Sequence, residues 1–354
     1  MNTADATATF LYGAGRMGRE VLAHCRAQGV EPKAFIDRAA VRLADIDGVP
    51  VITLEAAIKE GKGSDVLVAL HSPGVNIASV VEHLRREDFG SVRTLWNLCD
   101  KSDWQPQSPF WLEPHFNWAA HREAMVRARA LLTDETSRRV FDEQVALRRD
   151  GDYAALSQPT PDDQYMPRDL PRWREPMRLV DCGAYDGDTL RALAANGYAL
   201  GGFIALEPDP ENYARLSAAW GGAGDSDSRG RVIASGAWSS AGTLSFKAGE
   251  GGAAHLDESG DTTITVVRID DLCANFRPTM IKMDIEGAEH EALDGAAETI
   301  ARDRPDLALS VYHRIEDLWG IALKIDDWGH GYRFHLRSHA YNGFDTVLYA
   351  VASQ

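Results

Sequence analysis

Cysteine is scarce in this sequence, and so are features that would direct a chain to an oxidising compartment or a membrane. The four cysteines are scattered and form no C-x-x-C pair, which predicts reduced thiols rather than disulfides or a zinc site. No apolar run approaches the roughly 20 residues needed to span a bilayer, and the N-terminal residues show no signal-peptide pattern. We therefore expect a cytoplasmic protein that has no membrane partner.

Positive charge is also in short supply. The chain has 37 lysines and arginines against 53 aspartates and glutamates, which gives a formal net charge of −16. Such a surface repels phosphate backbones, so the composition disfavours nucleic acid as a partner. What the sequence does have is length, because 354 residues, 44% of them hydrophobic, are enough for two packed cores.

Residues 1–100 read as one small α/β unit. Short apolar runs alternate there with helical patterns, the runs at 9–12, 34–37, 49–52 and 66–70 and the helical patterns at 16–24, 54–59 and 77–86. This alternation predicts a Rossmann-like domain.

A glycine-rich turn, G-A-G-R-M-G, follows the first of these runs. Asp37 closes the next run 24 positions after Gly13 (37 − 13), which is the spacing of a dinucleotide fingerprint. With the segments F-I-D and G-V-P-V-I, the turn also resembles the nucleotide-sugar-binding domain found ahead of some sugar acetyltransferases. Three interpretations stay open: an NAD-type ligand, a nucleotide or nucleotide-sugar, and no ligand. A second nucleotide site here would use Gly13, Gly15, Arg16, Met17, Gly18 and Asp37.

Residues 101–177 change character and are expected to form a helical connector and a lid. An irregular passage rich in tryptophan and proline is followed by helical spacing at 122–132 and 135–149, and Asp134 is placed to cap the second helix. Five of the fifteen prolines fall between residues 151 and 178. Such a run is typical of a linker or of a segment that covers a ligand.

From residue 178 to residue 354 the apolar runs predict a seven-stranded sheet. The expected strands lie at 178–182, 202–207, 231–238, 280–285, 306–313, 332–337 and 346–351. Only a short polar turn joins the last two, which predicts an antiparallel hairpin at the sheet edge. Methyltransferases that use S-adenosylmethionine have this arrangement, whereas dinucleotide dehydrogenases more often finish their sheet with parallel crossovers.

The first strand of this half ends in a second glycine turn. An apolar run leads into Asp181, the turn carries Gly183 and Gly187, and Glu207 closes the next apolar run. Glycine lets the backbone approach a ligand closely, and the second acid can accept hydrogen bonds from ribose hydroxyls. The order strand, glycine turn, helix, strand, acid therefore predicts a site for an adenosine-bearing ligand.

Several motifs follow one another in order in the C-terminal half. They include D-C-G-A-Y-D-G-D-T-L, A-L-E-P-D-P-E-N-Y-A-R-L, I-K-M-D-I-E-G-A-E-H-E-A-L, L-S-V-Y-H-R-I-E-D-L-W and D-T-V-L-Y-A-V. Together they resemble the FkbM family of methyltransferases over roughly residues 130–352. The resemblance implies a class I methyltransferase fold, S-adenosylmethionine as the methyl donor, and usually O-methylation of a sugar or another small hydroxylated product.

The residues agree with this cofactor. Asp181 and Gly183 form the turn under its methionine part, Glu207 suits its ribose, and Gln164 and Tyr165 could fold over it as a lid. The complete set of cofactor-binding residues that we expect is Asp181, Gly183, Ala184, Tyr185, Asp186, Gly187, Glu207, Pro208, Asn212, Ala237, Trp238, Gln164 and Tyr165.

Asp284, Glu286 and His313 are the candidate catalytic residues, because they follow two successive strands at their carboxyl ends. Methyl transfer is an in-line displacement that depends on holding the nucleophile at attack distance, and a hydroxyl nucleophile must also lose a proton. We expect Asp284 to act as base or substrate anchor and His313 as the alternative base. Glu286 and His290 would share a helix face, but no third metal ligand is evident, so we expect no metal.

The sequence thus predicts an S-adenosylmethionine-dependent O-methyltransferase that acts on a sugar or glycosylated small metabolite. Its partner would be a small-molecule substrate, and the aromatic segment offers a surface for a homo-oligomer. Two alternatives remain: an NAD(H)-dependent oxidoreductase that uses the N-terminal glycine turn, and a non-catalytic nucleotide sensor.

Overall fold

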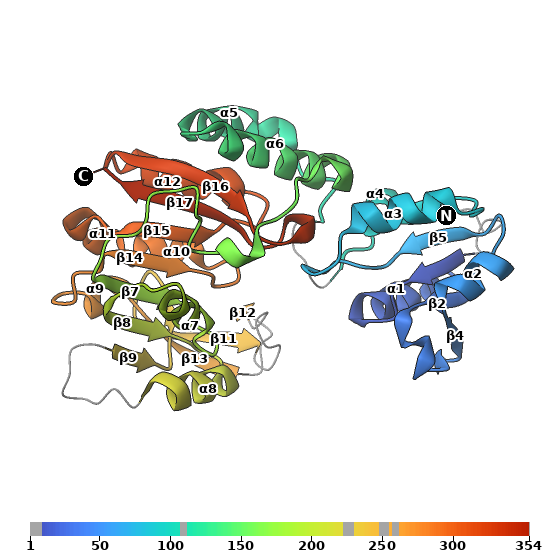
Figure 1. Ribbon diagram of the computed structural model, residues 1–354, viewed down its shortest axis with the longest axis horizontal. Coiled ribbons are helices and arrows are strands. Elements are labelled where there is room, and N and C mark those ends of the chain that lie inside the picture. The colour runs from blue at the N-terminus through green and yellow to red at the C-terminus, as the bar shows by residue number, and fades with distance from the viewer. Residues whose placement is uncertain (1–8, 107–111, 222–229, 248–254, 257–261, 354) are drawn as a thin grey trace. The chain divides into compact units, whose positions relative to one another are not determined.

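The computed structural model describes residues 9–106, 112–221, 230–247, 255–256 and 262–353. The chain forms two compact units (Figure 1), each with its own α/β sheet. The N-terminal unit consists of Met1–His121, Val140–Pro159 and Ala340–Phe344. The C-terminal unit consists of Arg122–Arg139, Thr160–His339 and Asp345–Gln354. The segment expected as a connector, residues 101–177, is therefore divided between the two units instead of forming a part of its own.

The N-terminal unit has a six-stranded sheet in the order β3-β4-β2-β1-β5-β6. Its strands are β1 (Thr9–Tyr12), β2 (Ala34–Ile36), β3 (Asp45–Ile46), β4 (Val49–Ile52), β5 (Asp65–Val68) and β6 (Val92–Thr94). All pairings are parallel except that of β3 with β4. The order reverses at β1, with β2 on one side and β5 on the other, which is the position where doubly wound sheets bind ligands.

Two hydrophobic clusters cover this sheet. One includes Met17, Val21 and Leu22 of α1 (Arg16–Ala27) with Leu95 and Leu98 of α4 (Leu95–Lys101). The other includes side chains of α2 (Leu54–Glu60) and α3 (Ile77–Arg86), together with Leu147 and Tyr153 from a later segment. The central strands β1, β2 and β5 are almost wholly buried, which explains their largely apolar sequences.

The C-terminal unit has the expected seven-stranded sheet, in the order β16-β17-β15-β14-β7-β8-β9. Its strands are β7 (Met177–Cys182), β8 (Leu200–Leu206), β9 (Gly230–Ile233), β14 (Met280–Met283), β15 (Asp306–Ser310), β16 (Tyr332–Ser338) and β17 (Thr346–Ala352). Strand β17 runs antiparallel to both of its neighbours, and the remaining pairings are parallel. The predicted antiparallel hairpin at the sheet edge is confirmed.

Helices flank this sheet, as the ribbon shows (Figure 1). They are α5 (Arg122–Leu131), α6 (Glu135–Asp150), α7 (Asp188–Ala195), α8 (Pro210–Trp220), α9 (Ile269–Leu272), α10 (Glu289–Asp294), α11 (Ala297–Asp303) and α12 (Asp317–Asp327), of which α6 begins in this unit and ends in the N-terminal one. The buried cluster contains Leu190 and Leu193 of α7 and Leu216 of α8, packed with strand residues such as Leu179 and Ala308.

A second, four-stranded sheet in this unit was not predicted. It has the order β10-β13-β11-β12, with β10 (Gly236–Ala237), β11 (Gly242–Lys247), β12 (His255–Leu256) and β13 (Thr262–Val267). The expectation of one strand over 231–238 is wrong, because β9 ends at Ile233 and residues 236–237 pair with β13 in the small sheet. The β-branched run T-T-I-T-V-V was the signal for β13.

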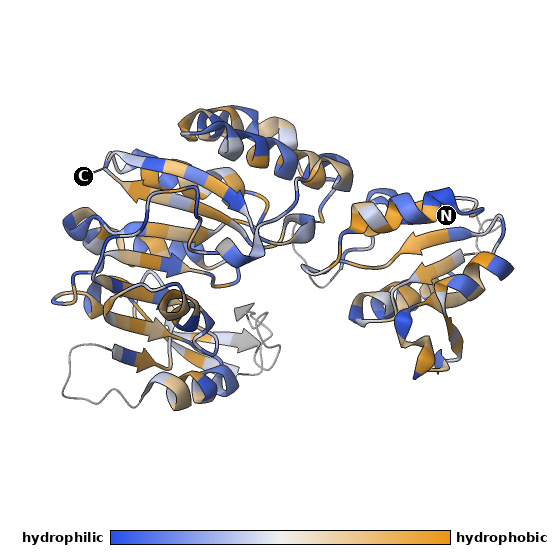
Figure 2. Ribbon diagram, in the orientation of Figure 1, coloured by the Kyte–Doolittle hydropathy of each residue, from blue (hydrophilic) through white to orange (hydrophobic). Residues whose placement is uncertain are grey.

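Colouring by hydropathy shows apolar residues concentrated in the strands of the six-stranded and seven-stranded sheets (Figure 2). Among the described residues, every helix is too short or too polar to cross a bilayer.

Candidate functional site

A cavity of about 430 Å³ opens at the carboxyl ends of the central strands of the C-terminal unit. Gly183 follows β7, Glu207 follows β8 and Asp284 follows β14, and all three line the cavity. Open parallel sheets bind their ligands at this edge, in the crevice beyond the strand ends.

The turn after β7 requires glycine at two positions. Gly183 has a φ of +78°, and a Cβ atom there would lie 1.9 Å from the backbone oxygen of Asp284. A side chain would therefore push the turn after β7 away from the turn after β14. Gly187, the N-cap of α7, has a φ of +86°, and its Cβ atom would lie 2.5 Å from the Trp220 indole nitrogen. Both glycines allow the backbone to pass closely where other residues would be strained.

Glu207 presents a buried carboxylate to the cavity. Its Oε2 accepts a hydrogen bond from the Tyr185 backbone N–H at 2.8 Å, and its Oε1 accepts one from the Asp209 N–H at 2.9 Å. Burial raises the pKa of Glu207 to about 7, although these two hydrogen bonds and the charge of Lys282 favour the ionised form. Each carboxylate oxygen keeps a lone pair for a ligand, so the group can accept hydrogen bonds from two hydroxyls.

Asp181 forms a buried ion pair beneath the cavity. Lys282 Nζ lies 3.1 Å from Asp181 Oδ1 and donates a hydrogen bond of 2.6 Å to the Gly183 carbonyl. Burial raises the pKa of Asp181 to about 6, and Lys282 opposes that rise. Asp181 is fully buried and does not line the cavity, whereas Lys282 does. The structure therefore places Asp181 behind the glycine turn, where it holds the lysine that supports the turn.

One wall of the cavity is apolar. Pro208 and Ala237 line it together with Ile264 and Val266 of β13, and Asn212 of α8 adds a polar edge. Such a wall suits a planar base, because aromatic faces pack on aliphatic side chains while a nearby amide can bond the ring edge.

Tyr165 closes another side of the cavity and is held by three hydrogen bonds. Its N–H donates to the Tyr349 hydroxyl at 3.0 Å, its carbonyl accepts from the Trp173 indole at 2.7 Å, and its hydroxyl donates to Asp284 Oδ2 at 2.8 Å. The residue is 6% exposed and has a φ of +62°. The hydrogen bonds explain how a non-glycine residue keeps this backbone conformation.

The end of the cavity opposite Glu207 is strongly acidic. Asp284, Glu286 and Asp345 line it, and the Tyr312 hydroxyl lies 3.4 Å from Asp284 Oδ1. Burial raises the pKa of Glu286 to about 7 and that of Asp345 to about 6. Burial would also raise the pKa of Asp284, but the charges of Lys282 and His313 keep it below its usual value. Asp284 is therefore the carboxylate that stays ionised most readily.

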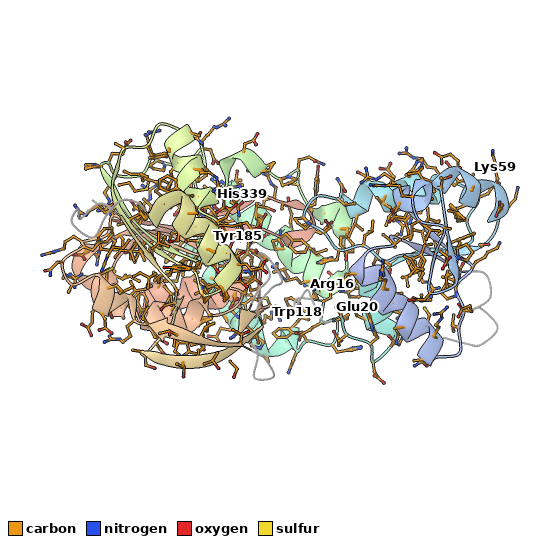
Figure 3. The ribbon with its side chains drawn as sticks, turned by 90° about the horizontal axis from the view of Figure 1, so that it is seen from below. Arg16, Glu20, Lys59, Trp118, Tyr185 and His339 are labelled. Atoms are coloured by element: carbon orange, nitrogen blue, oxygen red, sulfur yellow. The ribbon has the colours of Figure 1, made fainter. Side chains whose placement is uncertain are left out.

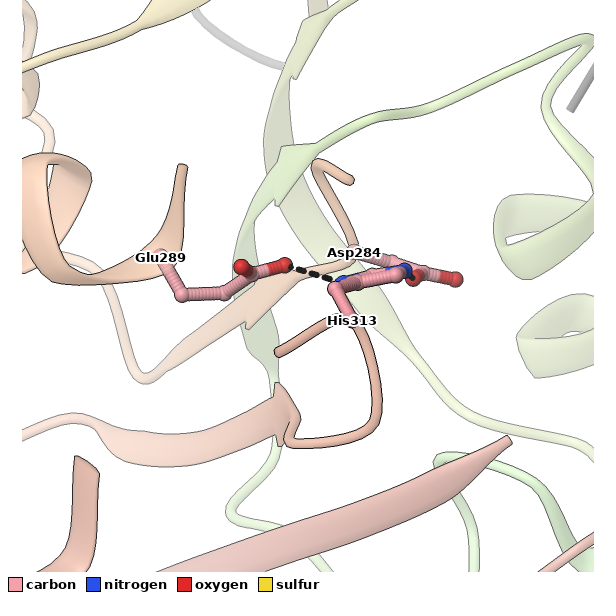
Figure 4. Close-up of side chains that lie close together, drawn as sticks. All are labelled: Asp284, Glu289 and His313. Carbon is pink, nitrogen blue, oxygen red and sulfur yellow. Dashed lines mark hydrogen bonds and ion pairs between the residues drawn. The ribbon is translucent and has the colours of Figure 1, made fainter. Parts of the chain in front are cut away.

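His313 stands behind Asp284 and is almost fully buried (Figure 4). Its Nδ1 lies 2.9 Å from Glu289 Oε1, and its Nε2 lies 3.3 Å from Asp284 Oδ1 and 3.7 Å from Glu286 Oε1. Burial would lower the pKa of His313, but the three carboxylates outweigh it and raise the pKa to about 10. The surrounding carboxylates therefore favour the protonated, positively charged form of the His313 imidazole.

Residues 181–336 match a protein-family model described as the methyltransferase FkbM domain. This part of the chain is therefore similar to FkbM methyltransferase domains. The matched span contains the glycine turn, Glu207 and the acidic end of the cavity, whereas Gln164, Tyr165 and Asp345 lie outside it.

The fold of the whole chain has a counterpart among solved structures. The crystal structure of the methyltransferase FkbM from Methylobacillus flagellatus KT superposes with a TM-score of 0.81 at 22% sequence identity, covering 98% of this chain and 90% of that chain. At that identity the likeness establishes the fold alone.

Two further structures show much weaker likeness. A precorrin-6y C5,15-methyltransferase from Geobacter metallireducens GS-15 has a TM-score of 0.31 at 12% identity and covers 50% of this chain and 80% of its own. The SAH-bound methyltransferase PaMTH1 from Podospora anserina has a TM-score of 0.29 at 13% identity, and the match covers 71% of this chain and 100% of that chain. No curated protein matches the sequence.

Most of the residues expected to bind cofactor or substrate in the methyltransferase domain line one cavity. These are Gln164, Tyr165, Gly183, Tyr185, Glu207, Pro208, Asn212, Ala237, Asp284 and Glu286. The others lie nearby and support it. Asp186 pairs with Arg191 at 2.6 Å, and Ala184 is buried. Gly187 faces Trp220, and Trp238 packs on the small sheet.

Sequence reasoning missed several cavity residues. They are Asp188, Ile264, Val266, Lys282, Ile285, Ala288, Tyr312 and Asp345. Lys282 had a detectable signal, since a charged residue in the middle of the apolar run M-I-K-M requires a buried partner. Asp345 had no such signal in the sequence. It immediately precedes β17, and it reaches this edge of the sheet only because β17 is inserted antiparallel beside β15.

The expectation that Glu286 and His290 share a helix face is wrong. Helix α10 begins at Glu289, and Glu286 precedes it with a φ of +54°. His290 Nε2 instead lies 3.4 Å from Asp317 Oδ1. Gly287 continues the turn with a φ of +92°. The turn after β14 is therefore longer than expected from the sequence, whose spacing places Glu286 on the helix.

In the N-terminal unit, residues of the glycine turn form hydrogen bonds and packing contacts with other parts of the chain. Asp37 accepts hydrogen bonds from the Ala14 N–H at 2.8 Å and the Ala39 N–H at 2.7 Å. A Cβ atom at Gly18 would lie 2.0 Å from the Gly13 carbonyl oxygen. Arg16 lies beside Glu20 along α1 (Figure 3), with 3.9 Å between the guanidinium and the carboxylate. Contacts within the chain therefore account for Gly18 and Asp37 without a ligand, whereas a Cβ atom at Gly15 would meet nothing within 4 Å.

Proposed function

We propose that the chain is an S-adenosylmethionine-dependent O-methyltransferase whose acceptor is a sugar or another small polyhydroxylated molecule. One observation carries the proposal. A single cavity of the FkbM methyltransferase domain has the buried carboxylate of Glu207 at one end and the ionised carboxylate of Asp284 at the other.

The residues fit the cofactor. Glu207 would accept hydrogen bonds from the two ribose hydroxyls through its free lone pairs, and Gly183 leaves the backbone open beside the methionine part. The adenine would lie on the apolar wall of Pro208, Ala237 and Val266. When bound, S-adenosylmethionine would supply the electrophilic methyl group.

The acceptor end suits hydroxyl groups. Asp284 and Glu286 offer hydrogen-bond acceptors, and the Tyr312 hydroxyl, which donates to Asp284 Oδ1 at 3.4 Å, offers a further acceptor oxygen, so a molecule with several hydroxyls can donate to more than one partner. Asp284 would hold the attacking hydroxyl and take up its proton, and Tyr165 fixes the carboxylate by donating to Oδ2. In a displacement of this kind, most of the rate enhancement can come from holding the nucleophile in position.

Titration calorimetry with S-adenosylhomocysteine tests the cofactor assignment. The wild-type protein should bind one molecule per chain, and Glu207→Ala should weaken binding at least tenfold because two hydrogen bonds to a charged acceptor are lost. Glu211→Ala, an exposed acid on the first turn of α8, is the matched control and should bind as the wild type does. Wild-type protein that is folded and fails to bind would overturn the proposal.

Transfer of a labelled methyl group to a panel of sugars, glycosides, amines and thiols tests the acceptor class. Incorporation confined to hydroxylated acceptors is the expected result. Methylation of amines or thiols alone would reject the O-methyltransferase assignment and leave the cofactor assignment intact.

A further inference from the structure

The acidic end of the cavity surrounds a buried imidazole. Asp284, Glu286 and Asp345 line the cavity, and Glu289 lies behind it without any exposed surface. Four carboxylates gathered this closely repel one another, and the cations described near them are Lys282 and His313. The arrangement is stabilised by any further positive charge that enters from the cavity.

The orientation of His313 is fixed from the far side. Glu289 Oε1 accepts a hydrogen bond from the Ile285 N–H at 3.0 Å and lies 2.9 Å from His313 Nδ1. With the Nδ1–H donated to Glu289, Nε2 faces Asp284 (Figure 4) and lies near Glu286. A metal cation that enters there would displace the Nε2 proton to solvent and bind the lone pair that this exposes. This Nε2 atom is buried and has no well-aligned hydrogen bond among the described residues. An imidazole whose other nitrogen is held by a carboxylate is the usual form of a metal-ligating histidine.

The distances suit a small divalent cation. His313 Nε2 lies 3.3 Å from Asp284 Oδ1 and 3.7 Å from Glu286 Oε1. Mg²⁺ and Mn²⁺ bind their ligands at about 2.1 Å, which separates neighbouring ligand atoms by about 3 Å in an octahedral shell. The two distances from Nε2 to the carboxylate oxygens, 3.3 and 3.7 Å, are close to that separation.

We infer that His313 Nε2, Asp284 and Glu286 bind a divalent cation of the Mg²⁺ or Mn²⁺ class, with Glu289 positioning the imidazole. One nitrogen and two carboxylates leave about three positions of an octahedral shell open toward the cavity. Oxygen atoms of water or of the acceptor can fill them. The binding site stands independently of the reaction, while its use in holding an acceptor rests on the proposed function.

The cation would select the acceptor. Two adjacent hydroxyls of a sugar can occupy neighbouring open positions, whereas an isolated hydroxyl can occupy only one. A bound cation also lowers the pKa of a coordinated hydroxyl. Acceptors with vicinal hydroxyls are therefore expected to be methylated in preference to matched monohydroxyl compounds.

Titration of the full-length protein with MnCl₂, followed by the electron paramagnetic resonance of free Mn²⁺, tests the site. The wild type should bind one Mn²⁺ per chain, Mg²⁺ should compete, and the bound ion should show nitrogen coupling from one imidazole. Glu286→Gln and His313→Gln should each weaken binding at least tenfold, and His313→Gln should abolish the nitrogen coupling. Glu316→Gln, an exposed acid before α12, is the control and should match the wild type.

Binding of S-adenosylhomocysteine by the same samples separates this inference from the proposed function. Protein that binds S-adenosylhomocysteine but no Mn²⁺ overturns the cation site and leaves the methyltransferase assignment standing. Mn²⁺ that binds equally to all variants, or without nitrogen coupling, is adventitious and also overturns the site. Protein that binds Mn²⁺ as expected but no S-adenosylhomocysteine upholds the site and contradicts the proposed function.

Discussion

Burial gives Glu207 a pKa close to neutrality. Transfer of a carboxylate from water into the protein favours its protonated form, and here the effect raises the pKa to about 7. Hydroxyl groups that donate to the carboxylate favour the ionised form. A ligand whose ribose bonds Glu207 must therefore lower the pKa again and release a proton when it binds.

The affinity for S-adenosylhomocysteine should consequently depend on pH. It should be constant well above pH 7 and weaken by up to about tenfold per pH unit below it, because a proton then competes with the ligand for Glu207. Calorimetry between pH 5.5 and 8.5 measures the slope, and Glu207→Gln should flatten it. Equal slopes in the wild type and the variant would assign the dependence to another group.

Asp134 ties the start of α6 to strand β16. Its carboxylate accepts hydrogen bonds from the Ser137 N–H and hydroxyl, both at 2.8 Å, and lies 2.6 Å from His335 Nδ1 and 3.3 Å from Arg337 Nη1. Burial would raise the pKa of Asp134, but these partners hold it well below its usual value. The sequence predicted the helix cap, while the strand partners come from residues about 200 positions away.

Asp134→Asn should lower the free energy of unfolding by about 1–3 kcal/mol, the usual effect of losing a charged hydrogen-bond partner in a partly buried network. Since the folded-state pKa is depressed, the stabilisation is present above the pKa of the unfolded state, about 4, and is lost as the pH falls below it. Urea unfolding at pH 7 and pH 3 measures both effects. The exposed Glu135→Gln should change neither, and a variant as stable as the wild type at pH 7 would contradict the expectation.

The core of the N-terminal unit is completed by a segment that lies far along the chain. Leu147 and Tyr153 pack in the same cluster as Phe10, Val66 and Ile77. Residues 140–159 therefore belong to the first unit although residues 122–139, which precede them, belong to the second.

Leu147→Ala should destabilise the N-terminal unit by about 2–5 kcal/mol, because a fully buried leucine is replaced by a cavity. The affinity of the native protein for S-adenosylhomocysteine should stay unchanged, since every described residue of that cavity belongs to the other unit. Calorimetric unfolding and ligand titration measure the two effects. Val126→Ala, at a position 63% exposed, is the control and should leave stability within about 0.5 kcal/mol.

The sequence by itself determined the two α/β sheets, the terminal hairpin and the ligand end of the cavity. These features depend on local signals: apolar runs of strand length, glycines before helices, and acids directly after strands. Gly183 and Glu207 could be recognised because both lie within one strand–helix–strand unit, whose geometry is set by its own residues.

Only the tertiary structure decided which residues meet at the acceptor end. Lys282 became the partner of Asp181 because β14 pairs with β7 in register, and Asp345 reached the cavity because β17 is inserted beside β15. The position of Glu289 behind His313 depends on where α10 begins. The helix begins at Glu289, whereas the sequence spacing predicts that Glu286 lies on it. Contacts between distant strands follow from sheet order and register, which a local pattern does not encode.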